Sequence, residues 1–240
     1  MRSRPEYDAA LIADLAWLGF VADRGPQRHT DDVAPYQRAL DDLSAQGLTY
    51  GCDCTRLTFG DWAESAGQPW SGGGCPGGCR DRALDGPVLR AAIGEGQESW
   101  SDGLAGPSSG EVAIHGDLPL RDRDGNWTYG LTVVVDDLQG GIDLVVRGRD
   151  LMDATPSQIR LGRLLGRPVP PAFLHHPLIT RPDGRKLSKS SGDTAVRELR
   201  EAGRTAEEVI AAAAAASGWD AAEADGQDTR SEGARPSFTG

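Results

Sequence analysis

The chain has 240 residues, 38% of them hydrophobic, and a formal net charge of −11 at pH 7. This length suits one large domain or two small ones with an adequate core, and the acidic balance argues against nonspecific coating of nucleic acid. No run of about 18 apolar residues occurs, so we expect no membrane-spanning helix. The N-terminus lacks the apolar core of a signal peptide. We therefore expect a cytoplasmic protein.

Two amphipathic helices are predicted near the N-terminus, over residues 6–18 and 33–46. In each, apolar side chains recur every three or four residues and define one face. A glycine follows each helix and favours its end there. We expect both faces to pack in the core; they carry Leu11, Leu15 and Leu18 in the first helix and Tyr36, Leu40 and Leu43 in the second.

All four cysteines lie within residues 50–80, as a CxC pair (Cys52 and Cys54) and a CxxxC pair (Cys75 and Cys79). Two close pairs of thiols in a reducing compartment favour a metal site over disulfides. Glycines beside the second pair let the backbone fold tightly around an ion. Four thiolates would complete a tetrahedral shell without an open position, so we expect one structural Zn²⁺. Four free buried thiols, or two disulfides in an exported protein, are the alternatives.

Residues 82–126 carry weaker patterns. The Gly/Ser content of one segment predicts an exposed loop, and β-branched or turn residues predict short strands and a hairpin turn around it. The expected elements are a strand over 88–93, the loop over 95–110, short strands over 112–114 and 118–120, and the turn over 122–126.

The centre of the chain predicts an open α/β sheet. The β-branched run at 129–135 is too continuous for a half-exposed strand, so we expect a buried parallel strand. Asp136 and Asp137 would then lie at its carboxyl end, where such sheets bind ligands; they could hold a metal or accept capping or sheet-edge hydrogen bonds. A strand, a helix and a strand follow in the order of a crossover unit. They cover residues 142–148, 155–165 and 173–180.

A basic loop follows the last strand, with the sequence Arg181-Pro-Asp-Gly-Arg-Lys-Leu-Ser-Lys-Ser-Ser191. Pro-Asp-Gly has turn chemistry, and Lys186 and Lys189 with the neighbouring hydroxyls suit a polyphosphate. A solvated basic loop would explain the same residues. Between Asp143 and Lys189, nine Arg or Lys stand against four Asp, which permits an anionic ligand at this locality.

Two helices are expected after this loop, over residues 193–202 and 205–216. Thr205 and Glu208 form the capping box that starts the second, and alanine, its main residue, is the strongest helix former. The remaining polar segment has the composition of disorder. The expected organisation is a catalytic domain over residues 1–219, with a zinc-binding insert over 50–80, and a disordered tail over 220–240.

Several segments recur in the order of a known family. They are Arg2-Ser-Arg-Pro-Glu-Tyr7, residues 14–19, residues 36–56, Val133-Val-Val-Asp-Asp137, Val146-Arg-Gly148, Asp150-Leu151, His176-Pro-Leu-Ile179 and Lys186-Leu-Ser-Lys-Ser190. Together they resemble the catalytic core of the glutamyl-tRNA synthetases over most of residues 2–219. The chain is most similar to the short members called glutamyl-Q tRNA(Asp) synthetases, because it ends soon after the signature loop and its cysteines resemble their zinc knuckle. Cys75 stands where those relatives usually carry a tyrosine ligand.

The resemblance implies an α/β fold, namely a Rossmann-like class I aminoacyl-tRNA synthetase catalytic core with a small zinc-binding insert. It implies a ligase that activates L-glutamate with ATP, accompanied by Mg²⁺, and transfers the glutamate to the queuosine of tRNA(Asp). We expect a monomer whose partners are L-glutamate, ATP and tRNA, without a membrane.

Carried over to this sequence, the resemblance places Tyr129 and Arg147 on the bound glutamate, with Arg147 gripping a carboxylate. Lys189, helped by Lys186, would contact the ATP phosphates, and His176 would line or support the ATP site. From the residues alone, Tyr129 could equally be a packed core tyrosine and Arg147 a surface ion pair, although a guanidinium fits a carboxylate with two donors. Adjacent strand residues point to opposite faces, which argues against a metal shared by the two neighbouring histidines.

One part of the family pattern is missing. Its first strand and helix, its His-x-Gly-His-type signature and the acidic residue that holds the amino group should precede Arg2. These features supply one wall of the adenylation site. Either the start is misplaced or truncated, or the protein is a remnant; because the remaining sites match the family pattern, we expect a truncated start. Two other functions are compatible with the sequence: a glutamyl-tRNA synthetase fragment that charges the tRNA 3′ end, and an inactive module that binds zinc and tRNA.

Overall fold

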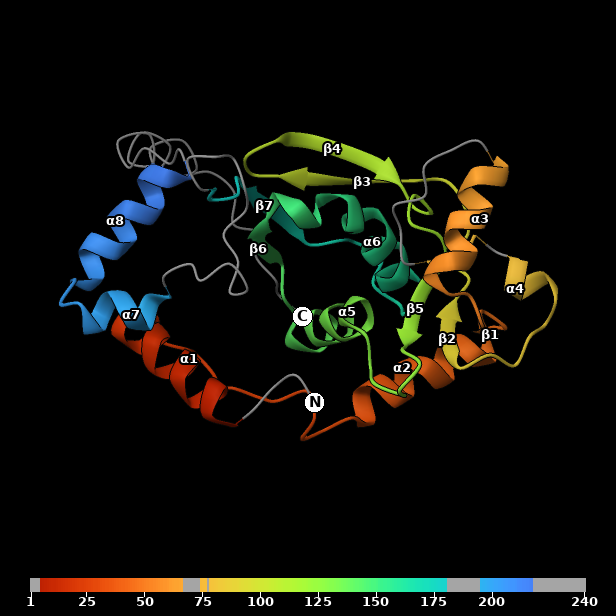
Figure 1. Cartoon of the computed structure of the whole chain (residues 1–240), viewed down its shortest axis with the longest axis horizontal. Helices are drawn as coiled ribbons and strands as arrows, with labels where there is room; N and C mark the ends of the chain where they lie inside the picture. Colours follow the sequence, from red (N-terminus) through yellow and green to blue (C-terminus); the bar gives the residue numbers. More distant parts are fainter. Residues whose placement is uncertain (1–4, 67–73, 77, 181–194, 218–240) are drawn as a thin grey trace, which may run out of the picture. The chain divides into compact units, whose positions relative to one another are not determined.

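The computed structural model of the chain describes residues 5–66, 74–76, 78–180 and 195–217. The chain divides into two compact units, Met1–Pro26 with Pro177–Gly240, and Gln27–His176. The second unit is the larger and holds both sheets (Figure 1). Among the helices of the described residues, none has the length and apolar character needed to cross a membrane.

A three-stranded antiparallel sheet forms one part of the larger unit, in the order β1-β2-β5. Its strands are β1 (Thr49–Cys52), β2 (Val88–Ala91) and β5 (Leu118–Arg121). Helix α2 (Ala34–Ala45) precedes β1, and helices α3 (Arg56–Ala66) and α4 (Gly78–Asp81) lie between β1 and β2 in the chain. The sheet therefore supports the stretch that contains the four cysteines.

A four-stranded mixed sheet forms the other part, in the order β4-β3-β7-β6. Its strands are β3 (Gln97–Asp102), β4 (Gly106–Glu111), β6 (Leu144–Gly148) and β7 (Ala172–His176). β3 and β4 make an antiparallel hairpin, whereas β7 runs parallel to both β3 and β6. Parallel pairing of β6 and β7 confirms the strand–helix–strand unit predicted for the centre of the chain.

Three helices pack against these sheets: α2, α5 (Tyr129–Gly140) and α6 (Thr155–Leu164), the last preceded by the 3-10 helix η1 (Arg149–Ala154). All three contribute to the main core with β2 and β5. α6 also carries Ile159, which packs with Trp100 and Phe173 of the four-stranded sheet. Each large apolar side chain buried in this way stabilises the folded state by about 1.5–3 kcal/mol. α6 thus joins the two cores.

Most elements predicted for the larger unit are confirmed. They are the helices over 33–46 and 155–165, the strands over 88–93, 118–120 and 142–148, and the turn over 122–126. Tyr36, Leu40 and Leu43 are buried on α2 as expected. The strand predicted over 173–180 is shorter and ends at His176, because the next residue is a proline and cannot donate to a sheet.

The strand predicted over 129–135 is wrong, because these residues begin helix α5. The β-branched residues favour a strand locally. However, the buried side chains Leu131, Thr132, Val134 and Val135 have helical spacing and face the core. Packing of one face outweighs the local preference, and Gly141 ends the helix at φ 62°. Asp136 and Asp137 therefore lie within a helix and not at the carboxyl end of a strand.

The loop predicted over 95–110 is also wrong, because it contains the β3–β4 hairpin. Alternate side chains of β3 are buried, namely Glu98, Trp100 and Asp102. Two of these three buried side chains are carboxylates. The sequence therefore lacks the alternation of apolar and polar residues by which a half-buried strand is recognised. Glu98 accepts hydrogen bonds from Arg160 Nε at 2.8 Å and Arg163 Nε at 3.0 Å, which permits its burial. The strand predicted over 112–114 does not form either, since these residues make a turn.

The smaller unit contains helices α1 (Pro5–Trp17), α7 (Val196–Glu201) and α8 (Ala206–Ala216) among its described residues. These helices were predicted. The capping box of α8 is confirmed, with the Glu208 amide donating to Thr205 Oγ1 at 3.2 Å.

The core packing predicted for α1 is not found, since Leu11 and Leu15 are 60% and 41% exposed. α7 and α8 consist largely of alanine and charged residues, which offer little apolar area to a leucine face. The loop over 181–191 and the tail over 220–240 lie outside the described residues.

Candidate functional site

Arg147 on β6 is directly paired with His175 of the parallel strand β7. Side chains paired across neighbouring strands project to the same face, and here that face is covered by α6. Arg147 is 7% exposed and His175 is fully buried. The alternative in which Arg147 forms a surface ion pair is therefore wrong.

The Arg147 guanidinium donates to three protein acceptors. Nε donates to His175 Nε2 at 3.0 Å, Nη1 to Gln158 Oε1 at 2.6 Å, and Nη2 to Thr155 Oγ1 at 2.7 Å. The guanidinium carbon also lies 5.0 Å from the centre of the Phe173 ring, at cation–π distance. A guanidinium has five N–H groups, so these bonds fix its plane and engage three of the five; the Tyr129 side chain is a further hydrogen-bonding neighbour that raises the pKa of Arg147.

Arg147 is a buried cation, yet none of the described residues provides a carboxylate in salt-bridge contact with it. Burial lowers the pKa of Arg147, while the neighbouring Tyr129 and, more weakly, Asp137 raise it. Burial also raises the pKa of Asp137, against the opposing effects of Arg167 and Arg147. A buried charge is costly unless it is paired. An anionic ligand at the two remaining N–H groups would provide that pairing.

Tyr129, the first residue of α5, is 54% exposed and is therefore not a packed core tyrosine. It lines an open cleft of about 480 Å³ together with His29, Asn126, Trp127 and other residues. This volume lies in the range of small-molecule sites. Tyr129 thus contacts both the cleft and the buried guanidinium, whose pKa it raises.

Asp136 accepts hydrogen bonds beside the same cleft. Tyr36 Oη donates to Asp136 Oδ1 at 2.8 Å, and His29 Nε2 lies 2.7 Å from Oδ2. Burial and then the contact with Asp136 raise the pKa of Tyr36. Of the roles expected for Asp136, the structure therefore favours that of a hydrogen-bond acceptor, here on a helix.

The expected ATP-site residues are only partly described. His176 pairs with Gly148 in the β6–β7 ladder, is half-buried and projects to the face opposite His175, as the alternation of a strand predicts. Lys186 and Lys189 lie outside the described residues. The structure therefore brings Tyr129 and Arg147 together and does not place the two lysines.

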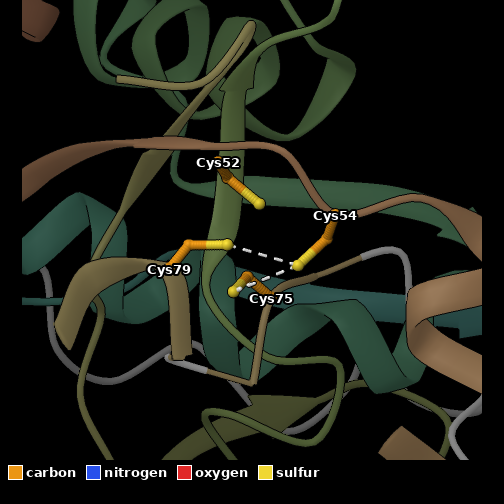
Figure 2. Close-up of side chains that lie close together, drawn as sticks. All are labelled: Cys52, Cys54, Cys75 and Cys79. Carbon is orange, nitrogen blue, oxygen red and sulfur yellow. Dashed lines mark hydrogen bonds between the residues drawn. The ribbon is translucent and has the colours of Figure 1, made fainter. Parts of the chain in front are cut away.

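The four predicted cysteine ligands meet in one buried cluster (Figure 2). Their sulfurs all lie within 4.8 Å of one another, with Cys54 Sγ 3.3 Å from Cys79 Sγ and 3.8 Å from Cys75 Sγ. Cys52 ends β1 and Cys79 belongs to α4. All four are free thiols, which contradicts the alternative of two disulfides.

The cluster fits a tetrahedral metal. Zn–S bonds of about 2.3 Å place neighbouring sulfurs about 3.8 Å apart, close to the separations found here. The cysteines are at most 9% exposed. Burial, and then the neighbouring thiols, raise the pKa of Cys54, so four bare thiolates would be unfavourable together. A divalent cation would compensate their charge.

Close backbone contacts fix the chain around these cysteines. A Cβ at Gly51 would lie 2.3 Å from the Gly86 nitrogen, and a Cβ at Gly86 would lie 2.3 Å from the Cys52 carbonyl carbon. On the other side, the Asp117 amide donates to the Cys75 carbonyl at 2.8 Å. Only glycine permits the close approach beside Cys52.

Sequence reasoning missed four residues of the Arg147 network: Asp102, Thr155, Gln158 and His175. Thr155 was predicted only as the first residue of the helix over 155–165, and His175 was considered only as one of the two neighbouring histidines that could share a metal. Asp102 lay in a segment predicted to be an exposed loop. The alternation of Glu98, Trp100 and Asp102 was the one signal that could have revealed a strand with an inward-facing carboxylate.

Residues 1–65 and 80–235 match the family model described as tRNA synthetases class I (E and Q), catalytic domain. The chain belongs to this family. The stretch left unmatched, residues 66–79, contains Cys75 and Cys79, so the class I synthetase core is interrupted within the cysteine-rich insert. The predicted family and fold class are confirmed.

Similar proteins carry two names within this class I family. Proteins named glutamyl-Q tRNA(Asp) synthetase from Nitratidesulfovibrio vulgaris and Symbiobacterium thermophilum are 38% and 39% identical, over 84% and 87% of this chain and 68% and 70% of those proteins. A protein named glutamate–tRNA ligase from a Synechococcus strain is 38% identical over 84% of this chain but only 44% of its own length.

Solved structures agree with this fold. A crystal structure of glutamate-tRNA synthetase from Elizabethkingia anophelis superposes with a TM-score of 0.63 at 22% identity, covering 80% of this chain and 44% of that chain. At this level of identity the likeness concerns the fold of the class I synthetase core.

Proposed function

We propose that this chain activates L-glutamate with ATP and transfers it to tRNA, with the queuosine of tRNA(Asp) as the preferred acceptor. The proposal is supported by the family to which the chain belongs and by the relatives named glutamyl-Q tRNA(Asp) synthetase at 38% and 39% identity. The catalytic domain would span residues 1–219 and act as a monomer.

The observation that carries this proposal is the buried Arg147 guanidinium, which lacks a carboxylate partner among the described residues. Its terminal nitrogens keep N–H donors that match the two oxygens of a carboxylate. Tyr129 lies beside it and borders an open cleft. Arg147 and Tyr129 would therefore bind glutamate, with Arg147 holding one of its carboxylates.

In the first step, a glutamate carboxylate oxygen would attack the α-phosphorus of ATP, and the bond to the bridging oxygen would break to release pyrophosphate. Lys186 and Lys189 would stabilise the charge that moves to pyrophosphate, and His176 would support the ATP site. Mg²⁺ bound with ATP would neutralise part of the phosphate charge. In the second step, an acceptor hydroxyl would attack the activated carbonyl and displace AMP. The protein would orient the reactants and form no covalent intermediate.

The cysteine cluster would hold one structural Zn²⁺ through Cys52, Cys54, Cys75 and Cys79. Four sulfur ligands leave no position for water or substrate, so the ion would stabilise the insert over residues 50–80 and take no part in the chemistry. The insert lies where the match to the family model is interrupted.

One alternative is supported by the relative named glutamate–tRNA ligase, which is 38% identical to this chain. Under that alternative, the chain would charge the tRNA 3′ end. A third candidate, an inactive module that binds zinc and tRNA, follows if the arginine network serves only the fold.

Glutamate-dependent ATP–pyrophosphate exchange separates these three functions. For the proposed function we expect exchange by the purified chain with glutamate and without any tRNA. Exchange that stays at background until tRNA is added would favour the glutamate–tRNA ligase alternative. A folded chain that binds tRNA but shows no exchange with any added tRNA would contradict both enzymatic functions. Aspartate and glutamine serve as control amino acids.

A further inference from the structure

A chain of buried polar groups continues from Arg147 into the neighbouring strands. His175 Nδ1 lies 2.5 Å from Asp102 Oδ2, and both side chains are fully buried. Asp102 Oδ1 in turn accepts from the Leu104 and Ala105 amides, each at 3.0 Å. β3, β7 and β6 thus contribute one polar residue each to a line that ends at the Arg147 guanidinium.

The proton on His175 can be placed from the chemistry of its neighbours. The Arg147 Nε–H group can only donate, so His175 Nε2, 3.0 Å away, must accept and carry no proton. The proton of the neutral ring is then on Nδ1, where Asp102 Oδ2 accepts it. Thr155 Oγ1 accepts from Arg147 Nη2 and lies 3.2 Å from His175 Nε2 and 3.3 Å from the Leu151 carbonyl. It is compatible with a bare Nε2, because its single proton can be donated to either of these two acceptors.

We propose that Asp102 is a positioning residue for Arg147. It fixes the tautomer of His175, and His175 holds the Nε side of the guanidinium so that its two remaining N–H groups face the ligand. This inference rests on the proposed function, in which that ligand is a carboxylate of glutamate. Neither Asp102 nor His175 would touch the substrate.

The substitution Asp102→Asn tests this role because it removes the charge and keeps the shape. If the amide oxygen keeps the bonds from the Leu104 and Ala105 amides, the amide nitrogen faces His175 Nδ1. Both groups cannot donate, so the His175 proton moves to Nε2 and opposes the Arg147 Nε–H. Loss of a charge-assisted hydrogen bond of this kind corresponds to about a ten- to hundredfold change in an equilibrium constant.

We expect Asp102→Asn to raise the KM for glutamate in the exchange reaction about tenfold or more, with the KM for ATP changed less than about twofold. The matched control is Glu98→Gln on the same strand, which removes another buried carboxylate with two arginine partners. The control should lower the melting temperature without a selective rise in the KM for glutamate. Equal changes in both KM values for Asp102→Asn would overturn the proposal.

Two substitutions of His175 provide a second comparison. A glutamine side chain has one donor and one acceptor group and can partly replace the ring between Asp102 and Arg147, whereas leucine can do neither. We expect His175→Gln to have a KM for glutamate closer to that of the wild type than His175→Leu has. Identical KM values in the two variants, at equal folded fractions, would count against the proposal.

The proton position is measured independently of activity by NMR of the full chain with ¹⁵N-labelled histidine. Four histidines are present, and the His175→Gln variant assigns the signal of the buried ring. We expect a protonated Nδ1 and a bare Nε2. A ring protonated at Nε2 would overturn the inference. A wild-type chain without exchange activity would contradict the proposed function alone. In that case the NMR experiment would still determine the tautomer of His175, and calorimetry would measure the affinity for glutamate in place of the KM.

Discussion

The cysteine cluster and the Arg147 network are both buried polar sites of the larger unit, but they differ in how the chain builds them. The cluster uses four residues of one type from a single stretch, Cys52 to Cys79. The network uses five types from β3, β6, β7 and α6, including Asp102, Arg147 and His175. The cluster has four thiols that could hold a cation, whereas in the network the Arg147 guanidinium has no carboxylate in direct contact among the described residues. We therefore propose that the cluster serves the structure and that the network serves substrate binding.

This difference in composition predicts that the cluster affects the stability of the protein and that the network affects its function. Four thiolates that bind one tetrahedral ion leave no open position for a further ligand. Arg147 instead keeps two N–H groups after three internal hydrogen bonds, and Tyr129 beside it reaches a cleft. A change in the cluster should thus act first on folding. A change in the network should act on the affinity for glutamate.

The largest effect is expected from the cysteines. Cys79→Ser removes one of four ligands, and structural zinc sites contribute about 10–16 kcal/mol of apparent binding free energy in small domains. Metal analysis should find one zinc per wild-type chain and much less in the variant, with a lower melting temperature. Asp102→Asn, the matched change in the network, should retain its zinc. Well under one zinc per wild-type chain after mild purification would contradict the metal site.

A smaller effect is expected at the backbone beside Cys52. Gly51→Ala would place a methyl group 2.3 Å from the Gly86 nitrogen, and such overpacking costs about 1–3 kcal/mol. Gly60→Ala on α3 is the matched control, because a Cβ there meets no atom within 4 Å and alanine favours a helix by about 0.5–1 kcal/mol. Urea unfolding should show destabilisation in the first variant and stabilisation in the second. Equal effects would argue against the close approach.

The smallest effect concerns pH and the network. Burial alone raises the pKa of Asp102, but hydrogen bonds from the Ala105 amide, His175 and the Leu104 amide outweigh it and lower the pKa from 3.8 to about 2. A lowered pKa stabilises the fold at neutral pH, and this stabilisation is lost as the pH falls from about 4 to below 2. The difference in free energy of unfolding between wild type and Asp102→Asn should shrink by about 1 kcal/mol from pH 6 to pH 3. A difference independent of pH would contradict the ionised, hydrogen-bonded carboxylate.

Local sequence signals predicted those parts of the fold in which local preference and packing agree. The capping box at Thr205 and the amphipathic face of α2 are examples. The local sequence signals gave a wrong prediction at α5, where a β-branched run folds as a helix because its buried face packs on the core. They failed again at β3, where inward-facing Glu98 and Asp102 gave the strand a loop-like composition.

The same limit applies to the sites. The cysteine ligands were predictable because residue type and spacing alone indicate a metal site, and the structure brings all four together. Tyr129 and Arg147 were identified through the resemblance to the synthetase family, and their roles are still proposals. The partners of Arg147 could not be predicted, because Asp102 and His175 are 73 residues apart in the chain and meet only through the order of the strands.

The most direct measurement of the central assignment compares the wild type with Arg147→Lys in glutamate-dependent ATP–pyrophosphate exchange. Lysine keeps the positive charge but loses the planar fork that holds a carboxylate with two donors. We predict exchange by the wild type with glutamate and a KM for glutamate raised about tenfold or more in Arg147→Lys, with little change in the KM for ATP. The same KM for glutamate in both proteins would contradict the assignment of Arg147 to the glutamate carboxylate.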